Sequence, residues 1–299
     1  MLKRLYIYLK EMLPPYKAAL VAVVLFFEIY FLIIFISESH AFNVGLPEAV
    51  GCITIFVFLL TLRIADDLKD FKTDAALFPG RPLPSGRVLK KDVITLLVAS
   101  NVVTLVLNLL FMNNLLFYAI LMAYAALMSV WFFARSKIQK SLMLALVTHN
   151  PVGMVMIAYI ISFTCFKYGY PLFSVNNLLI LFTLYWPTLI WEIARKTRAP
   201  KDETEYTTYS KLFGYRKVTA LILGIVTCDV VTSAILMFQL WGWGVIAAVA
   251  AYVWFAIECL RFMRNPESFK LVSKVELYEL VTEAPVILIE MAYVLRWLG

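Results

Sequence analysis

The sequence predicts an all-α, polytopic membrane protein with nine transmembrane helices, and composition and apolar patterning both lead to this fold class. Of the 299 residues, 62% are hydrophobic and only 16% are charged, whereas soluble domains have about 45–50% apolar and about 25% charged residues. The apolar residues also gather into runs close to the roughly 20 residues that cross a bilayer as a helix. This composition excludes a disulfide-rich secreted scaffold, a disordered chain and an ordinary soluble enzyme.

Nine apolar runs follow one another along the chain. They cover residues 17–36, 49–67, 92–111, 115–134, 142–166, 177–195, 217–238, 244–262 and 280–297. The first run is too long for the apolar part of a cleaved signal peptide. Two longer polar connections, at about 66–91 and 196–216, are where we expect chemistry to be located. Because no linker or low-complexity segment interrupts the pattern, we expect one domain over residues 1–299.

The basic residues predict the orientation of these runs. Of the 27 Lys and Arg residues, 25 lie in the amino-terminal segment and in alternate connections on one side. Only Lys167 and Arg296 fall on the other side. The positive-inside rule then places the amino terminus in the cytoplasm and the carboxyl terminus outside, and we expect a bacterial plasma membrane. The net charge of +7 therefore needs no nucleic-acid partner.

Four aspartates follow where the second run reaches the membrane surface: Asp66, Asp67, Asp70 and Asp74. If the helix continues, the last three lie within about 60° of one another, because each residue turns the helix by about 100°. Arg63 lies on the same face. Converging carboxylates repel one another unless a cation lies between them, and oxygen-only ligands suit Mg²⁺. The alternative is a solvated helix end with lysine partners.

A stiff loop carrying two arginines comes next, at residues 78–87. Its prolines and glycines restrict the backbone to a narrow set of turns. A guanidinium group matches the geometry of phosphate oxygens. We therefore expect Arg63 and Arg81 to contact a phosphorylated substrate.

Together, the aspartates and the loop resemble the first aspartate-rich motif of the UbiA-type prenyltransferase superfamily, which includes the 4-hydroxybenzoate polyprenyltransferases. That motif reads Asn-Asp-x-x-Asp-x-x-x-Asp, followed shortly by Arg-Pro-Leu-Pro-x-Gly. Here Asp66 replaces the asparagine, and the rest matches through Asp67, Asp70, Asp74 and the segment 81–86. The resemblance implies helices around a central cavity that opens sideways to lipid. It also implies Mg²⁺ as cofactor and an isoprenoid diphosphate as substrate.

The family carries a second acidic motif after the sixth helix, and this chain departs from it. Glu192 stands in for one aspartate, and Asp202 comes only after a basic run. In the functional interpretation, these two acids help to bind a second Mg²⁺, and Arg195, Lys196 and Arg198 contact diphosphate oxygens. In the structural interpretation, Glu192 forms a salt bridge to Lys196 one helical turn later.

Other polar and aromatic residues are further candidates. Arg135 and Lys137, after the fourth run, resemble a family region near the diphosphate, although positive-inside anchoring explains them equally well. His149, beside Pro151 in the fifth run, is the candidate base. Side chains expected to line the cavity are those of Asn101, Asn150, Tyr185, Trp191 and Tyr209. Hydrogen bonds between helices, or placement of aromatic rings at the membrane interface, are the structural alternatives.

These features predict an Mg²⁺-dependent intramembrane prenyltransferase that moves an isoprenoid chain from an allylic diphosphate to a small acceptor. We expect the acceptor to be aromatic or otherwise lipophilic, and the membrane lipid to be the other partner. A terpene cyclase of the same superfamily is the first alternative, since it ionises the same kind of diphosphate. A membrane transporter or lipid-binding protein that uses the acidic face for cations is the second.

Overall fold

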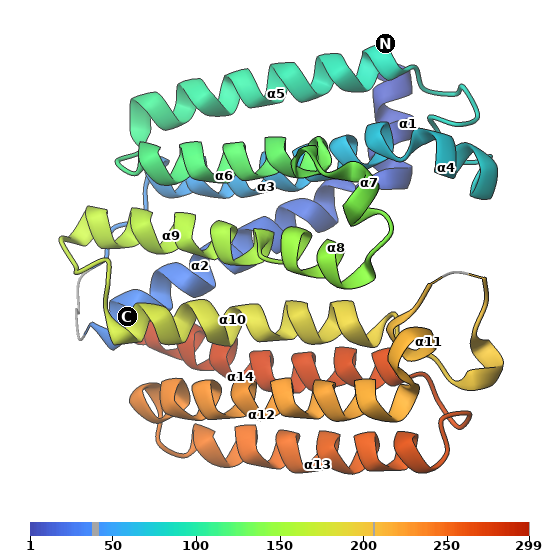
Figure 1. The fold of residues 1–299 in the computed structure, drawn as a ribbon. Coiled ribbons are helices and arrows are strands. Elements are labelled where there is room, and N and C mark those ends of the chain that lie inside the picture. The colour runs from blue at the N-terminus through green and yellow to red at the C-terminus, as the bar shows by residue number, and fades with distance from the viewer. Residues whose placement is uncertain (38–41, 206, 299) are drawn as a thin grey trace. The chain divides into compact units, whose positions relative to one another are not determined.

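The computed structural model describes residues 1–37, 42–205 and 207–298, and within these ranges the chain is helical without a strand (Figure 1). It divides into two compact units. Unit 1 consists of Met1–Tyr30, Ala41–Arg135 and Ala158–Tyr170, and unit 2 consists of Phe31–His40, Ser136–Ile157 and Pro171–Gly299. The predicted all-α class is confirmed.

Unit 1 carries the amino-terminal helices and the first polar segment. Its elements are α1 (Leu2–Met12), most of α2 (Pro15–Ile36), α3 (Leu46–Lys69), α4 (Phe71–Leu77), α5 (Lys90–Phe111), α6 (Leu115–Ser129), the 3₁₀ turn η1 (Trp131–Phe133) and the second part of α9 (Val152–Tyr168). Helix α3 packs against both α5 and α6 (Figure 1). Helix α1 is an element that our reading of the sequence did not predict.

Unit 2 carries the second polar segment. Its elements are the end of α2, most of α7 (Arg135–Ile138), α8 (Leu142–His149), the first part of α9, α10 (Val175–Ala194), η2 (Pro200–Asp202), α11 (Tyr209–Phe213), α12 (Tyr215–Leu240), α13 (Gly244–Arg264) and α14 (Leu271–Leu298). Helices α10, α12, α13 and α14 run side by side (Figure 1). Their shared core is apolar and includes Ile190, Ile222, Phe255 and Tyr278, so burial of these faces holds the unit together.

Seven helices in the described ranges are long and apolar enough to cross a membrane, rather than the nine predicted. The predicted run at 115–134 forms only the 15-residue helix α6, because the backbone leaves the helical conformation after Ser129. The predicted run at 280–297 belongs to the 28-residue helix α14, which carries charged side chains along its length. The seven spans nevertheless make the chain an integral, multi-pass membrane protein.

The run at 142–166 is interrupted, as the proline in it predicts. Helix α8 ends at His149 and α9 begins at Val152, so Asn150 and Pro151 lie between two helical segments of one span. A proline ring has no N–H to donate and clashes with the carbonyl four residues earlier, which ends the first segment here.

The turn after α6 is strained. Trp131, Phe132 and Phe133 have φ angles of 56°, 49° and 56°, in the left-handed region that costs a non-glycine residue about 1–2 kcal/mol. The Phe132 ring meets Tyr124 edge-on, with the centroids 5.5 Å apart. The Phe133 side chain is 84% exposed. The strain at Phe133 is therefore not offset by burial of its own ring.

Glycine at position 133 should relieve this strain. We expect Phe133→Gly to be more stable than Phe133→Ala by about 1 kcal/mol, since both remove the same exposed ring and only glycine adopts positive φ without a steric cost. The thermal unfolding midpoints of the two variants in detergent micelles measure the difference, about 2 °C for a chain of this size. An alanine variant as stable as the glycine variant would show that the turn is unstrained.

Candidate functional site

The end of α3 carries a buried carboxylate with two partners. Asp67 is only 5% exposed. Arg63, one turn earlier, reaches it through Nε, which lies 3.2 Å from Oδ2, and through Nη2, which contacts Oδ1. The hydroxyl of Tyr8 on α1 donates to Oδ2 at 2.7 Å. The prediction that Arg63 and Asp67 share a face is confirmed.

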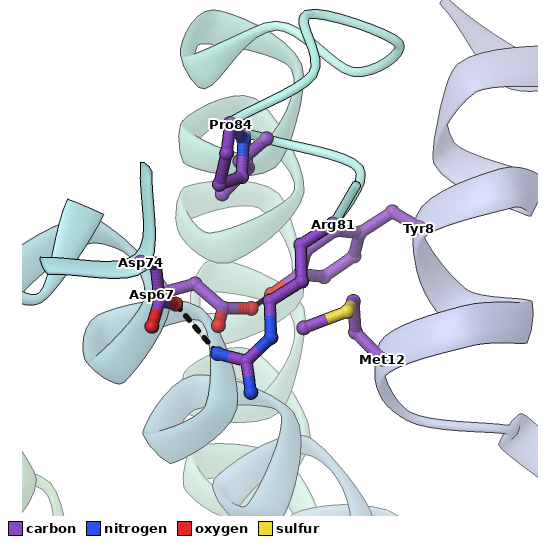
Figure 2. A pocket seen from close by; sticks show the side chains of 7 residues that line it. Tyr8, Met12, Asp67, Asp74, Arg81 and Pro84 are labelled. Atoms are coloured by element: carbon purple, nitrogen blue, oxygen red, sulfur yellow. Dashed lines mark hydrogen bonds and ion pairs between the residues drawn. The ribbon is translucent and has the colours of Figure 1, made fainter. Parts of the chain in front are cut away.

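The carboxylate of Asp74, on α4, is also paired with an arginine. Arg81 Nη1 lies 2.7 Å from Asp74 Oδ2, and the guanidinium group lies 4.2 Å above the Phe78 ring. Figure 2 shows that Arg81 and Asp74 lie beside Asp67 and Tyr8 around one small pocket. The apolar side of that pocket is formed by Met12, Leu83 and Pro84.

Asp70 lies at the junction between two helices and not within one continuous helix. Helix α3 ends at Lys69, and Asp70 has φ −99° and ψ 9° before α4 begins. Among the described residues its side chain makes no ion pair or hydrogen bond. Burial raises the pKa of Asp70 above its ordinary value, against the opposing effect of Lys69, and the neighbouring Asp66 adds to the rise. Asp70 is therefore a half-buried carboxyl group without a paired cation among the described residues, and it is not one of the residues that line the pocket.

The lysine beside Asp70 is engaged elsewhere. Lys69 Nζ lies 2.7 Å from Asp66 Oδ1 and 4.7 Å from the centroid of the Trp131 ring in the strained turn. The Asp66 side chain is 53% exposed. The pairing of Asp66 with a lysine matches the solvated helix end that the sequence left open for this residue.

Helix α1 is tied to the polar segment at several points. Arg87 in the loop donates from Nη1 and Nη2 to the two Glu11 carboxylate oxygens, at 2.5 and 2.8 Å, and from Nη2 to the Gly80 carbonyl at 2.6 Å. It holds the pKa of Glu11 below its ordinary value. Near the start of the helix, Arg4 Nε lies 2.5 Å from Asp92 Oδ2. The apolar spacing of residues 5, 8, 9 and 12 is the helical signal that could have revealed α1.

In unit 2, the acid expected to bind a second metal ion is paired with two basic residues that directly follow the end of α10. Glu192 pairs with Arg195 at 2.5 Å and with Lys196 at 2.9 Å. The Arg195 guanidinium also lies 5.1 Å from the Trp191 ring. The salt bridge from Glu192 to Lys196 is the one that the structural interpretation of the sequence predicts.

In the rest of the second polar segment, hydrogen bonds join residues on either side of the loop between α10 and α11. Glu203 accepts hydrogen bonds from Thr208 at 2.6 Å and from Ser210 at 2.5 Å, and the Ser210 oxygen accepts from the Arg198 backbone N–H at 2.8 Å. Asp202 is exposed in η2. Glu203 therefore holds residues at the start of α11 in place, whereas the side chain of Asp202 remains accessible.

Several of the remaining candidate residues make hydrogen bonds or packing contacts within the protein. His149 Nδ1 lies 2.9 Å from the Thr148 hydroxyl. Asn101 donates to Thr61 at 2.9 Å and so links α5 to α3. Tyr209 is 2% exposed within the core of unit 2.

The other members of the predicted set differ in exposure. Tyr185 is buried on α10, and Trp191 is 38% exposed. The side-chain oxygen Oδ1 of Asn150 is buried and has no hydrogen-bond partner among the described residues. Arg135 and Lys137 are exposed on α7, and the charge of Arg135 acts on Asp70.

The predicted residues thus form two groups. Asp67, Asp74 and Arg81 line one pocket in unit 1, whereas Glu192 and Asp202 belong to unit 2. Within the described part of the chain, no three His, Cys, Asp or Glu side chains are arranged as a ready-made metal site.

Comparisons with known proteins identify the fold. No family model and no curated protein sequence matches the chain. A solved structure described as digeranylgeranylglyceryl phosphate synthase in membranes matches with a TM-score of 0.70. The alignment covers 97% of this chain and 99% of that one, at 14% sequence identity. This chain therefore has the same fold as that membrane protein, which agrees with the helical membrane fold that the motif resemblance implies.

Proposed function

We propose that the chain is an intramembrane prenyltransferase that uses an isoprenoid diphosphate as donor. The observation that carries this proposal is the meeting of Asp67, Asp74 and Arg81 around one pocket in a chain with the fold of a membrane prenyltransferase. Two acids and a guanidinium group are the chemistry that a metal diphosphate needs. The basic-residue bias supports a cytoplasmic position for this pocket in a bacterial plasma membrane.

The donor set fits Mg²⁺ as cofactor. Asp70 is half-buried without an ion pair, and Asp74 has one cationic partner. Proteins commonly hold Mg²⁺ through one or two carboxylates, with substrate phosphate oxygens completing the shell. Bound there, Mg²⁺ would neutralise negative charge on the diphosphate.

Two arginines near the pocket are proposed to bind the diphosphate. Arg63 and Arg81 are each paired with an aspartate, and each keeps about a third of its side chain exposed. In our proposal they turn to the phosphate oxygens when the substrate arrives, because charge-assisted bonds to phosphate are strong and often bidentate. Arg195, Lys196 and Arg198 are proposed to contribute further positive charge, with Glu192 and Asp202 as candidate ligands of a second metal ion.

The proposed reaction exchanges one bond for another. The bond between the allylic carbon and the diphosphate oxygen breaks, and its electron pair leaves with the diphosphate. The acceptor then donates an electron pair to the allylic carbon and releases a proton. His149 is our candidate base, and the apolar helices exclude the water that would otherwise capture the cation.

A donor and acceptor panel tests the proposal. We expect purified protein with Mg²⁺ to prenylate one acceptor in a set of aromatic acids and isoprenoid glyceryl phosphates, the latter included because of the structural neighbour. Mass spectrometry of the products identifies the donor chain length and the acceptor. The Glu267→Gln variant, which loses only an exposed ion pair with Lys201, serves as a control and should retain full activity.

The same panel separates the alternatives. A cyclic hydrocarbon or alcohol formed without any acceptor would assign the chain as a terpene cyclase. Intact diphosphate under every condition, together with cation-dependent flux in vesicles, would assign it as a transporter. Either result would overturn the proposed transferase.

A further inference from the structure

Helix α1 brings an aromatic hydroxyl to the buried aspartate of the pocket. Tyr8 is fully buried, and its ring packs in an apolar cluster with Leu60 and Ile64 of α3 and with Leu83 of the loop. Its hydroxyl lies 2.7 Å from Asp67 Oδ2. A carboxylate only accepts hydrogen bonds, so the Tyr8 hydroxyl is the donor in this contact.

The two partners of Asp67 differ in their freedom to leave. The Arg63 side chain is 30% exposed and carries a charge that a phosphate would attract. Tyr8 is 0% exposed and is held by the packing of its ring. If Arg63 turns to a diphosphate, Tyr8 is the partner that stays.

The position of α1 is itself fixed at both ends. Arg4 pairs with Asp92 near the first turn, and Glu11 pairs with Arg87 near the last. These contacts leave the Tyr8 hydroxyl little freedom to shift along the helix axis. An exposed salt bridge such as Glu11–Arg87 contributes little by itself, but together with the Arg4–Asp92 pair, in which Asp92 is buried, it defines one register of α1 against the loop and α5.

We propose that Tyr8 is a positioning residue that orients the Asp67 carboxylate toward a divalent cation after Arg63 has moved to the diphosphate. A carboxylate offers about four acceptor positions. The three hydrogen bonds from Arg63 and Tyr8 occupy most of them. Loss of the two arginine bonds frees positions for a metal ion, while the Tyr8 bond keeps the carboxylate from rotating. This inference rests on the proposed function, because it assigns Asp67 a metal ligand's role.

Binding of Mn²⁺, a paramagnetic probe for a Mg²⁺ site, tests the proposal without turnover. Electron paramagnetic resonance counts free Mn²⁺ in the presence of inorganic diphosphate and purified protein. We expect Tyr8→Phe to raise the Mn²⁺ concentration for half-saturation by about tenfold, as for loss of one hydrogen bond to a charged group. Tyr6→Phe is the matched control, because Tyr6 lies on the same helix and is 65% exposed.

A double-variant comparison separates positioning from packing. Asp67→Asn should weaken Mn²⁺ binding, and adding Tyr8→Phe to it should weaken binding no further, because the two residues act through one contact. In turnover assays, Tyr8→Phe should raise the half-saturating Mg²⁺ concentration and leave kcat at saturating Mg²⁺ close to that of the parent. Loss of packing alone would lower the unfolding midpoint and would not change the Mg²⁺ dependence.

Three outcomes would overturn the inference. One is parental Mn²⁺ binding by a folded Tyr8→Phe variant, and another is an equal effect of Tyr8→Phe with and without Asp67. The third is parental binding by Asp67→Asn, which would remove Asp67 from the metal site. Failure of the proposed function would give a different result. Tyr8→Phe and Asp67→Asn would still weaken Mn²⁺ binding as expected, but the protein would consume no donor in the panel.

Discussion

Asp70→Asn is expected to slow prenyl transfer by about a thousandfold and to leave the fold intact. Asp70 is the carboxylate of the first motif without an ion pair among the described residues, so it is the one most available to a metal ion. An amide has the same shape but no charge. Loss of a metal contact that stabilises the leaving diphosphate removes several kcal/mol, and about 4 kcal/mol corresponds to this rate change.

Single-turnover rates at saturating Mg²⁺ and donor measure this effect. The Glu267→Gln variant is the carboxylate-to-amide control. The unfolding midpoint of Asp70→Asn should equal or exceed that of the parent, because burial disfavours the charged form of Asp70. A rate within threefold of the parent would remove Asp70 from the site, even if the chain proved to be a prenyltransferase.

Gly51→Ala is expected to destabilise unit 1 by about 3 kcal/mol. A Cβ atom at position 51 would lie 2.1 Å from Cε2 of Phe26, whose ring is fully buried between α2 and α3. Adding a methyl group to a filled core forces side chains off their rotamers and shifts the backbone. The close approach of these two helices thus depends on a glycine, as is common in membrane helices.

Thermal unfolding in detergent measures the loss, and two variants control for it. Gly224→Ala, in α12, meets no atom within 4 Å and should stabilise the chain by about 0.5–1 kcal/mol, because glycine weakens a helix interior. Adding Phe26→Leu to Gly51→Ala should restore part of the stability by making room for the methyl group. Equal midpoints for Gly51→Ala and the parent would show that α2 and α3 are less tightly packed here.

The pairing of polar groups was less predictable than their presence. Four aspartates and an Arg-Pro-Leu-Pro segment predict an acidic, arginine-bearing site because their types and spacing are written in the sequence. Which aspartate is paired depends on neighbours that are distant in the chain. Tyr8 reaches Asp67 across 59 positions, and no local periodicity reports such a contact.

The positions at which helices end were also hard to predict from the sequence. The run at 115–134 predicts a full span by apolarity, yet α6 ends at Ser129 because residues 131–133 adopt positive φ. Hydropathy measures the transfer of side chains into lipid and does not report the backbone conformation. The break at Pro151 was predictable, because a missing N–H is a property of the residue itself.

The sequence by itself determined the all-α membrane fold, the first motif and the expectation of diphosphate chemistry. The fold follows from apolar runs and charge bias, which are local or additive properties, and the expectation of diphosphate chemistry comes from the resemblance of the first motif to that of the UbiA-type prenyltransferases. The tertiary structure decided that Asp70 alone among the four motif aspartates lacks an ion pair within the described residues, and that Glu192 is paired with the basic residues that follow α10. It also made α1 part of the pocket. The reason is physical, since burial and ion pairing depend on which segments pack together in space.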